Sequence, residues 1–270
     1  MNAPSTHAVA SDHTRNSLLR VALVGLAAGL LGGMFGVGGG ILIVPALTIV
    51  LGLEQRLAHG TSLAAILPIA GASLLTYWSV GNVDWPVALW IALGAIAGAV
   101  VGTKLLQVIS KRALTIGFVA IMLATAVRLF IPTEGTAREA LTVLGAIALF
   151  AVGLLSGTLA GLLGVGGGII MVPAMVVLFG MPSVIAKGTS MAVIIPTSVM
   201  GTIRNRAVQN ADVKVAAIVG LTGVASAVGG SLIADRMSDR VSNALFAVLL
   251  VVVAVRQLTT LRTAPVGRPA

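Results

Sequence analysis

Residues 29–47 read GLLGGMFGVGGGILIVPAL and residues 157–175 read GTLAGLLGVGGGIIMVPAM, so one motif occurs twice at a spacing of 128 positions. The alignment continues without a gap, because 20 of the 40 residues from 29 to 68 are identical to their counterparts from 157 to 196. An internal repeat of this length in an apolar chain is typical of a membrane transporter built from two related halves.

The composition agrees with a membrane location. The 270 residues are 57% hydrophobic and only 9% charged, and the mean hydropathy is +1.07. This leaves too little polar surface to cover a water-soluble globule. The apolar stretches are longer than the alternating segments of about 10 residues found in outer-membrane barrels, so we predict an all-α polytopic membrane protein. The formal charge of +9 comes from scattered Lys and Arg residues, which indicates membrane topology and no nucleic-acid binding.

The apolar segments fall into two sets of five: 18–35, 41–53, 57–80, 85–106 and 113–131, then 140–163, 169–181, 184–203, 213–234 and 241–258. The run after Arg20 continues into the repeated motif, so we interpret it as a retained span and not as a cleaved signal. The chain is therefore divided into a cytoplasmic tail at 1–16, a first membrane repeat at 17–131, a connecting loop at 132–139, a second membrane repeat at 140–260 and a cytoplasmic tail at 261–270.

The distribution of positive charge predicts how these segments are oriented. If the chain is threaded from a cytoplasmic N-terminus, twelve of the 17 basic residues fall at cytoplasmic ends and five at the opposite ends. Both termini are therefore expected in the cytoplasm. An odd number of crossings in each half inserts the second repeat upside down, which predicts two inverted-topology repeats.

The segments that follow the two GVGGG strings are short. Residues 41–53 rise only about 20 Å, whereas the hydrocarbon core of a bilayer is about 30 Å thick. We therefore predict that each string is the tip of a Gly-rich re-entrant or broken-helix hairpin, with one hairpin entering from each face. Non-helical backbone at this depth must be buried in protein or line a polar cavity, so the paired tips are the candidate substrate site.

The residues at these tips suit a negatively charged ligand. Successive glycines let the main chain approach a ligand closely, and the free N–H groups of the helices that follow attract an anion. The next segment contains HGTS in the first half and KGTS in the second, which adds hydroxyl groups and one cation. The candidate substrate-binding residues are Gly38, Gly39, Gly40, His59, Thr61, Ser62, Gly166, Gly167, Gly168, Lys187, Thr189 and Ser190.

Some of these residues have structural alternatives. Lys187 could be a snorkelling residue at the membrane interface, and His59 could serve only as a cap or a hydrogen-bonding group. All eight acidic residues lie in the N-terminal tail or near segment ends, whereas a cation transporter usually keeps an acid at depth. We therefore expect an anionic or neutral substrate. Asn82, Asp84, Asn210 and Asp212 each precede an apolar segment, and we predict that they are N-terminal caps of the helices formed by these segments.

The sequence offers little material for catalysis. It contains no Cys, which excludes disulfides, Fe–S clusters and thiol chemistry, and it has no cluster of His or acidic residues. We therefore predict a protein that is not an enzyme and has neither a cofactor nor a metal site.

The doubled motif, followed by HGTSL at 59–63 or KGTSM at 187–191 and then by Asn-X-Asp at 82–84 or 210–212, resembles the TauE/SafE sulfite exporter family of bacterial membrane permeases. This resemblance extends from about residue 18 to residue 258. It implies a multi-pass carrier in the bacterial plasma membrane for sulfite, sulfoacetate or other organosulfonates. It also implies that the two glycine strings and the two Thr-Ser pairs lie near the ligand. Because His59 stands where the second half has Lys187, unequal charge is expected from the two half-sites.

The expected function is alternating-access transport of a small sulfur-containing anion. The expected partners are that anion and the lipid bilayer, and the sequence is compatible with a homo-oligomer. Two alternatives remain open from the residues: an anion channel that uses the glycine turns as a filter, and a membrane assembly subunit that does not transport.

Overall fold

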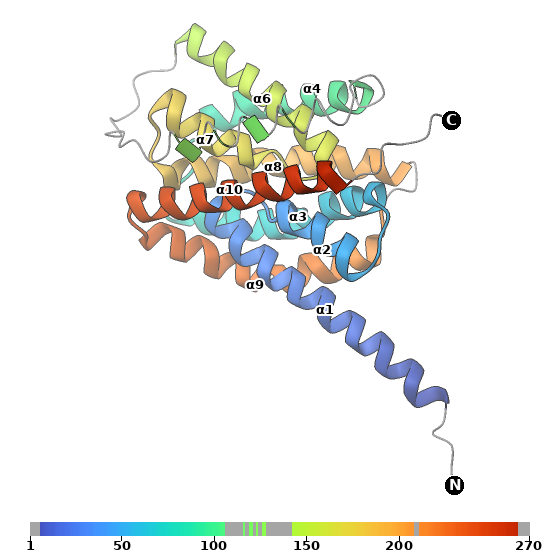
Figure 1. The fold of residues 1–270 in the computed structure, drawn as a ribbon. Coiled ribbons are helices and arrows are strands. Elements are labelled where there is room, and N and C mark those ends of the chain that lie inside the picture. The colour runs from blue at the N-terminus through green and yellow to red at the C-terminus, as the bar shows by residue number, and fades with distance from the viewer. Residues whose placement is uncertain are drawn as a thin grey trace.

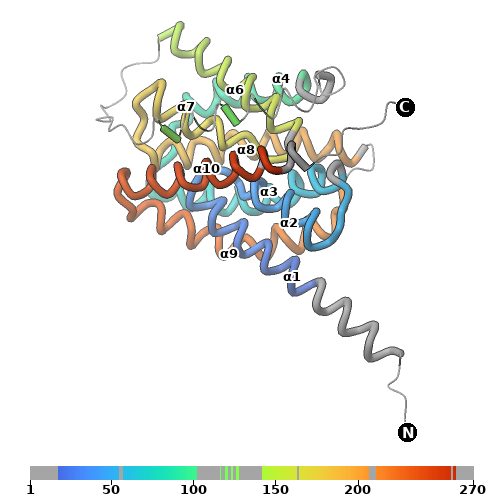
Figure 2. Tube along the Cα trace, viewed as in Figure 1, coloured from blue at the N-terminus to red at the C-terminus, as the bar shows by residue number. Residues whose placement is uncertain are grey.

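The structure, a computed structural model, describes residues 6–105, 142–207 and 211–263, and the single positions 116, 119, 120, 123, 126 and 127. Every regular element within these residues is an α-helix (Figure 1). Most of the predicted segment 113–131, the connecting loop at 132–139 and Asn210 lie outside the described residues (Figure 2). In chain order the helices are α1 (Thr6–Phe35), α2 (Gly40–Val50), α3 (Gln55–Ser79), α4 (Trp85–Leu105), α6 (Val143–Leu163), α7 (Gly168–Phe179), α8 (Ser183–Ala207), α9 (Val213–Arg236) and α10 (Asp239–Thr263).

These helices follow the predicted segments to within a few residues, with one difference at the start of the chain. The sequence predicts the first segment from residue 18, but α1 begins at Thr6. No Gly or Pro occurs between Thr6 and Arg20, so nothing in the polar stretch interrupts the helix. Most of the stretch expected as a tail is therefore helical.

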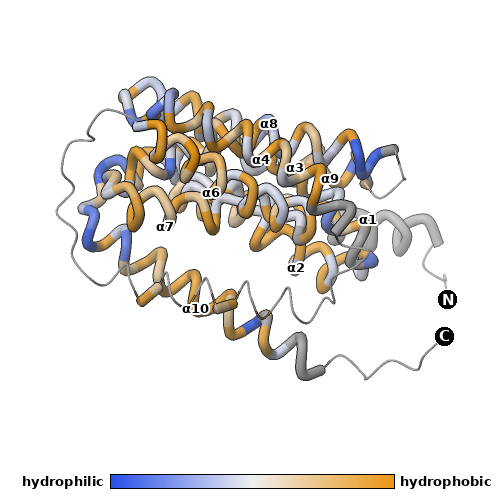
Figure 3. The backbone as a smooth tube through the Cα atoms, turned by 90° about the horizontal axis from the view of Figure 1, so that it is seen from above, coloured by the Kyte–Doolittle hydropathy of each residue, from blue (hydrophilic) through white to orange (hydrophobic). Residues whose placement is uncertain are grey.

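The outer surface of the helices is apolar. Five of the described helices are long and apolar enough to cross a membrane: Leu18–Phe35 of α1, Leu57–Ser79 of α3, Val143–Leu162 of α6, Ser183–Arg206 of α8 and Val213–Arg236 of α9. Leu144 is 77% exposed and Leu221 is 68% exposed, which suits lipid better than water. Hydrophobic residues extend along the helices, whereas hydrophilic residues gather mainly near their ends (Figure 3). The chain is a multi-pass membrane protein.

The first helix of each half packs on the fourth helix of the other half. The contacts between α4 and α6 and between α1 and α9 are the most extensive of the described pairs. Glycine allows both contacts to be close: a Cβ atom on Gly29 would overlap the carbonyl oxygen of Gly223, and one on Gly157 would overlap that of Ala95. Residues 29 and 157, like 95 and 223, are 128 positions apart. The same packing contact therefore occurs twice, between equivalent residues of the two halves.

Two of the predicted helix caps are confirmed and one is wrong. The Asp84 carboxylate accepts a hydrogen bond from the Val87 N–H at 3.2 Å. The Asp212 carboxylate accepts from two N–H groups in the first turn of α9, at 2.9 and 3.1 Å. The Asn82 side chain does not cap α4; its amide donates to the Asp235 carboxylate at 2.6 Å, because the turn after α3 reaches the end of α9.

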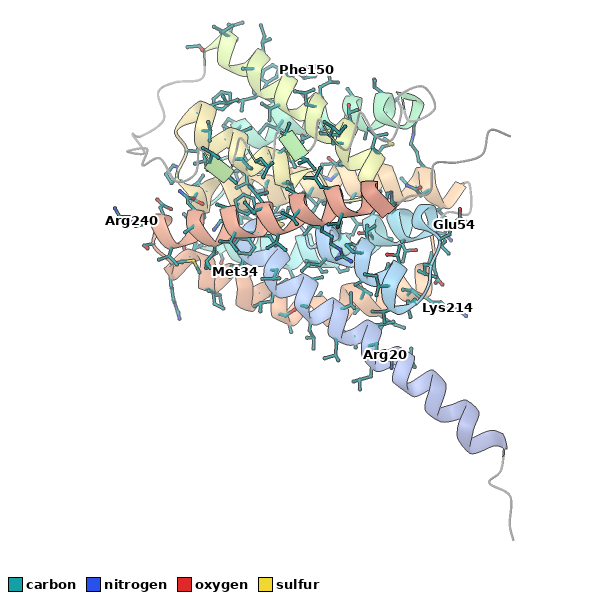
Figure 4. All side chains as sticks on the ribbon, viewed as in Figure 1. Arg20, Met34, Glu54, Phe150, Lys214 and Arg240 are labelled. Carbon is teal, nitrogen blue, oxygen red and sulfur yellow. The ribbon has the colours of Figure 1, made fainter. Side chains whose placement is uncertain are left out.

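Charged side chains lie at both ends of the helical bundle. Glu54 and Lys214 lie at one end and Arg240 lies at the other (Figure 4). The short helix α2 lies toward the end with Glu54, and α7 lies toward the opposite end, in both Figure 1 and Figure 3. With 11 and 12 residues, these two helices rise less than about 20 Å, as expected from the short predicted segments.

Candidate functional site

Two glycine turns meet in the interior of the bundle. The first turn, residues 36–39, joins α1 to α2, and the second turn, residues 164–167, joins α6 to α7. A Cβ atom on Gly40 would lie 3.0 Å from the carbonyl oxygen of Gly164. A Cβ atom on Gly168 would lie 2.5 Å from the carbonyl oxygen of Gly36. The main chains of the two turns are thus in direct contact.

The conformation of both turns requires glycine. Gly38 and Gly39 have φ of 71° and 80°, and Gly166 and Gly167 have φ of 81° and 79°, values that L side chains rarely adopt. No side chain caps the start of α2 or of α7, and both starts are buried. The first N–H groups of a helix have no partner within it, so each turn presents buried hydrogen-bond donors. This is the arrangement that attracts an anion.

Two isoleucines lie between the turns. Cβ atoms on Gly38 and Gly166 would each lie within 3.6 Å of side-chain atoms of both Ile66 and Ile194. Ile66 belongs to α3 and Ile194 to α8, and both are fully buried. Since they are 128 positions apart, they occupy equivalent places in the two halves. The space between the turns is therefore filled by equivalent apolar side chains from α3 and α8.

The threonines of the two Thr-Ser pairs join the halves of the chain. The Thr189 hydroxyl accepts a hydrogen bond from the backbone N–H of Asp84 at 2.9 Å. The Thr61 hydroxyl accepts the equivalent hydrogen bond from the backbone N–H of Asp212, also at 2.9 Å. Both threonines are fully buried, so each hydroxyl oxygen satisfies an N–H group at the start of α4 or α9. The sequence named these threonines and aspartates separately, but it gave no sign that they pair across the two halves.

The serines next to them differ from each other. Ser190 donates to the carbonyl oxygen of Gly36 in the first turn at 2.5 Å, or to that of Lys187 at 2.7 Å. Ser62, its equivalent in the first half, is also fully buried, but its hydroxyl has no hydrogen-bond partner among the described residues. An unpaired buried hydroxyl destabilises a fold by about 1–3 kcal/mol, so it calls for an explanation.

Lys187 is buried against the first turn. A Cβ atom on Gly36 would lie 2.6 Å from the Lys187 Cα atom, so the start of this side chain packs directly on the turn. The ammonium group donates to the hydroxyl of Ser242 on α10 and lies 6.0 Å from the centre of the Phe35 ring. The Asp239 carboxylate at the start of α10 also interacts with it electrostatically. A buried cation of this kind needs compensation by negative charge or dipoles.

His59 has the equivalent place in the first half. A Cβ atom on Gly164 would lie 2.8 Å from the His59 Cα atom, so this residue packs on the second turn as Lys187 packs on the first. The structure thus places Lys187 and Ser190 against the first turn and His59 against the second. The two threonine hydroxyls are directed to the starts of α4 and α9 instead. Sequence reasoning missed Ser242 and Phe35, because Ser242 lies outside the motif and Phe35 is a position of the motif that differs between the two halves.

The described residues contain no group of three or more His, Asp or Glu side chains that could hold a metal ion.

The chain is similar to known membrane proteins over nearly its whole length. A sequence model of the family described as "Sulfite exporter TauE/SafE" matches residues 3–129 and 148–269. A "Probable membrane transporter protein" of Xylella fastidiosa is 31% identical over 240 residues, which cover 86% of this chain and 90% of the relative. The relative YunE of Bacillus subtilis is 29% identical over 69% of this chain and 77% of its own length, and YjnA of the same organism is 27% identical over 86% and 96%. Both are described as probable membrane transporter proteins.

Proposed function

Because this chain belongs to the TauE/SafE sulfite exporter family, we propose that it is a secondary transporter for a small sulfur-containing anion in the bacterial plasma membrane. The substrate class is sulfite, sulfoacetate or another organosulfonate. Such a molecule carries several acceptor oxygens and a negative charge, and it has no need of a metal or a cofactor for binding. A homo-oligomer in the bilayer is compatible with this function.

The observation that carries the proposal is that two uncapped, buried helix starts each contact the opposite glycine turn. The N–H groups of α2 and α7 can bind oxygens of one anion from two sides. The unpaired Ser62 hydroxyl supplies a further donor, and the Lys187 ammonium supplies the charge. The Ser62 hydroxyl has no partner among the described residues, and the Lys187 ammonium is buried, so both would gain from an anion between the turns.

The repeated contacts support alternating access as the mechanism. The contacts of α1 with α9, of Thr61 with Asp212 and of Gly164 with His59 each have an equivalent shifted by 128 residues. We propose that they reflect two inverted repeats, whose Gly-rich hairpins approach each other from opposite faces of the membrane. Ile66 and Ile194 fill the space between the turns, so an anion can enter when α3 and α8 move relative to the hairpins.

The first test combines a binding screen with a transport assay. The purified protein is screened by thermal shift against sulfite, sulfate, thiosulfate, taurine, sulfoacetate and simple carboxylates. A bound ligand at 100 times its Kd stabilises the folded state by about 2.7 kcal/mol. The anion that stabilises the protein is then loaded into proteoliposomes, and labelled anion is added outside. A carrier gives transient accumulation by counterflow; unitary currents in a planar bilayer would instead identify a channel and contradict the proposal.

Ser62 provides a residue-level test of the site. Ser62→Ala removes a buried hydroxyl that has no partner among the described residues, so thermal stability should stay equal or rise. Anion affinity should fall by about tenfold to a hundredfold, since one hydrogen bond to a charged group is worth about 1.5–3 kcal/mol. Ser190→Ala is the matched variant in the other half, and it should lower stability because Ser190 bonds the first turn. Unchanged affinity in Ser62→Ala would remove Ser62 from the site.

A further inference from the structure

Unpaired hydroxyl groups are concentrated on two helices. Five buried side-chain polar atoms have no hydrogen-bond partner in the described part of the chain, and four of them are hydroxyls on α3 or α8. These four residues, Ser62 and Ser73 on α3 and Ser198 and Thr202 on α8, are here called the hydroxyl seam. The two helices pack directly against each other. The fifth atom, Asn243 Oδ1, belongs to α10 and lies next in sequence to Ser242.

Other hydroxyl groups in these helices and in α9 donate to a backbone carbonyl group one turn earlier in the same helix. Thr76 on α3 donates to the Ala72 carbonyl at 3.0 Å, and Thr197 on α8 donates to the Val193 carbonyl at 2.8 Å. Ser231 on α9 does the same with Ala227 at 2.9 Å. Serine and threonine in membrane helices commonly satisfy themselves in this way. The seam hydroxyls do not, although Ser62, Ser73 and Ser198 are fully buried.

The seam passes the glycine turns. Ser62 lies one helical turn before Ile66, and Ser198 lies one turn after Ile194, so each shares a helix face with an isoleucine that contacts both turns. Thr202 continues the face of Ser198 by one more turn.

Contacts between the two helices order the seam from end to end. The helices run antiparallel, because a Cβ atom on Gly201 would meet Leu63 and one on Gly188 would meet Tyr77. In this register Ser62 and Thr202 lie at one level, Ser198 lies level with Ile66 at the turns, and Ser73 lies toward the other end.

We propose that the hydroxyl seam is the path by which a small oxyanion reaches and leaves the glycine turns. This inference rests on the proposed transport function and extends it to residues outside the repeated motif. A buried hydroxyl without a protein partner can donate to a water or to an anion oxygen without first breaking a bond. Arg204 and Arg206 lie in the last turn of α8, just beyond Thr202, and raise the local concentration of anions at that end.

Cysteine labelling tests the path, because the natural chain contains no Cys and therefore gives no background. Ser73→Cys, Ser198→Cys and Thr202→Cys are reconstituted and treated with 2-sulfonatoethyl methanethiosulfonate, a membrane-impermeant sulfonate that modifies thiols. Thr197→Cys and Ser231→Cys are matched controls, since both positions are buried but their hydroxyls already bond the backbone. We expect the seam variants to react at least about tenfold faster than the controls, because a charged reagent enters apolar packing poorly. Added sulfoacetate, which does not attack the reagent, should slow the reaction.

The outcomes separate this path from the transport function. Seam variants that react no faster than the controls overturn the path, while counterflow by the unchanged chain still supports the central site. Fast reaction that sulfoacetate does not slow overturns the contact with the anion. If the unchanged chain gives no counterflow, that result contradicts the proposed function, regardless of the labelling rates. Ser198→Ala gives an independent reading if a cysteine variant misfolds: its thermal stability should be retained and its flux lowered, and unchanged flux contradicts the path.

Discussion

Gly168→Leu is expected to abolish transport. Gly168 is the first residue of α7, and a Cβ atom there would lie 2.5 Å from the Gly36 carbonyl oxygen and 2.8 Å from the Val37 Cα atom. Both obstructing atoms belong to the main chain of the opposite turn, so no side chain can rotate away to make room. The two turns must separate, and overpacking of this kind costs up to about 3 kcal/mol. If that energy is lost from anion binding, counterflow falls by about a hundredfold.

The matched control is Gly229→Leu in α9, where a Cβ atom would meet nothing within 4 Å. Both substitutions add the same side chain to a glycine without a positive φ, so they differ mainly in what the side chain meets. Gly229→Leu should express, unfold and transport like the unchanged chain. Normal flux in Gly168→Leu would show that the contact between the turns is not part of the transport site.

The sequence predicted the helices of this fold better than it predicted which helices pack against each other. The helix bounds and the short lengths of α2 and α7 could be obtained from apolar runs interrupted by glycine. The packing of α1 on α9 and of α4 on α6 could not, because these helices are apolar on most faces and show no single stripe that marks a partner. The choice is made by the exact positions of glycines such as Gly29 and Gly157, whose fit depends on the facing backbone.

The candidate site shows the same limit. The repeat drew attention to the glycine turns and the Thr-Ser pairs, because identical residues recur at one spacing, and it drew attention to Lys187 because His59 replaces it in the first half. It could not reveal that Thr61 and Thr189 bond the backbone at Asp212 and Asp84, since such bonds join segments more than 100 residues apart. The resemblance placed both Thr-Ser pairs near the ligand and did not distinguish them, whereas Ser190 is hydrogen-bonded and Ser62 has no partner among the described residues.

Lys187→Met is expected to separate stability from function. Methionine has a similar length but no charge, so it can fill the same space without the desolvation of a buried ammonium, and thermal stability should stay equal or rise. The anion loses its cationic partner, and a hydrogen bond to a charged group is worth about 1.5–3 kcal/mol. Counterflow at low anion concentration should therefore fall by about tenfold to a hundredfold. Lys214→Met is the control, because Lys214 is exposed at the start of α9, and its flux should be unchanged.

Ser242→Ala then decides whether Lys187 binds the anion or only stabilises the contact between α10 and α8. The Ser242 hydroxyl accepts the hydrogen bond of the ammonium group, so it competes with an anion for that donor. If Lys187 binds the anion, removal of this competitor should keep or increase affinity, whereas Lys187→Met lowers it. If Lys187 serves only to hold α10, the two variants break the same contact and should impair stability and flux alike. The result that assigns Lys187 to the site is therefore an anion affinity that is kept or raised in Ser242→Ala and lowered in Lys187→Met, measured by thermal shift on both variants.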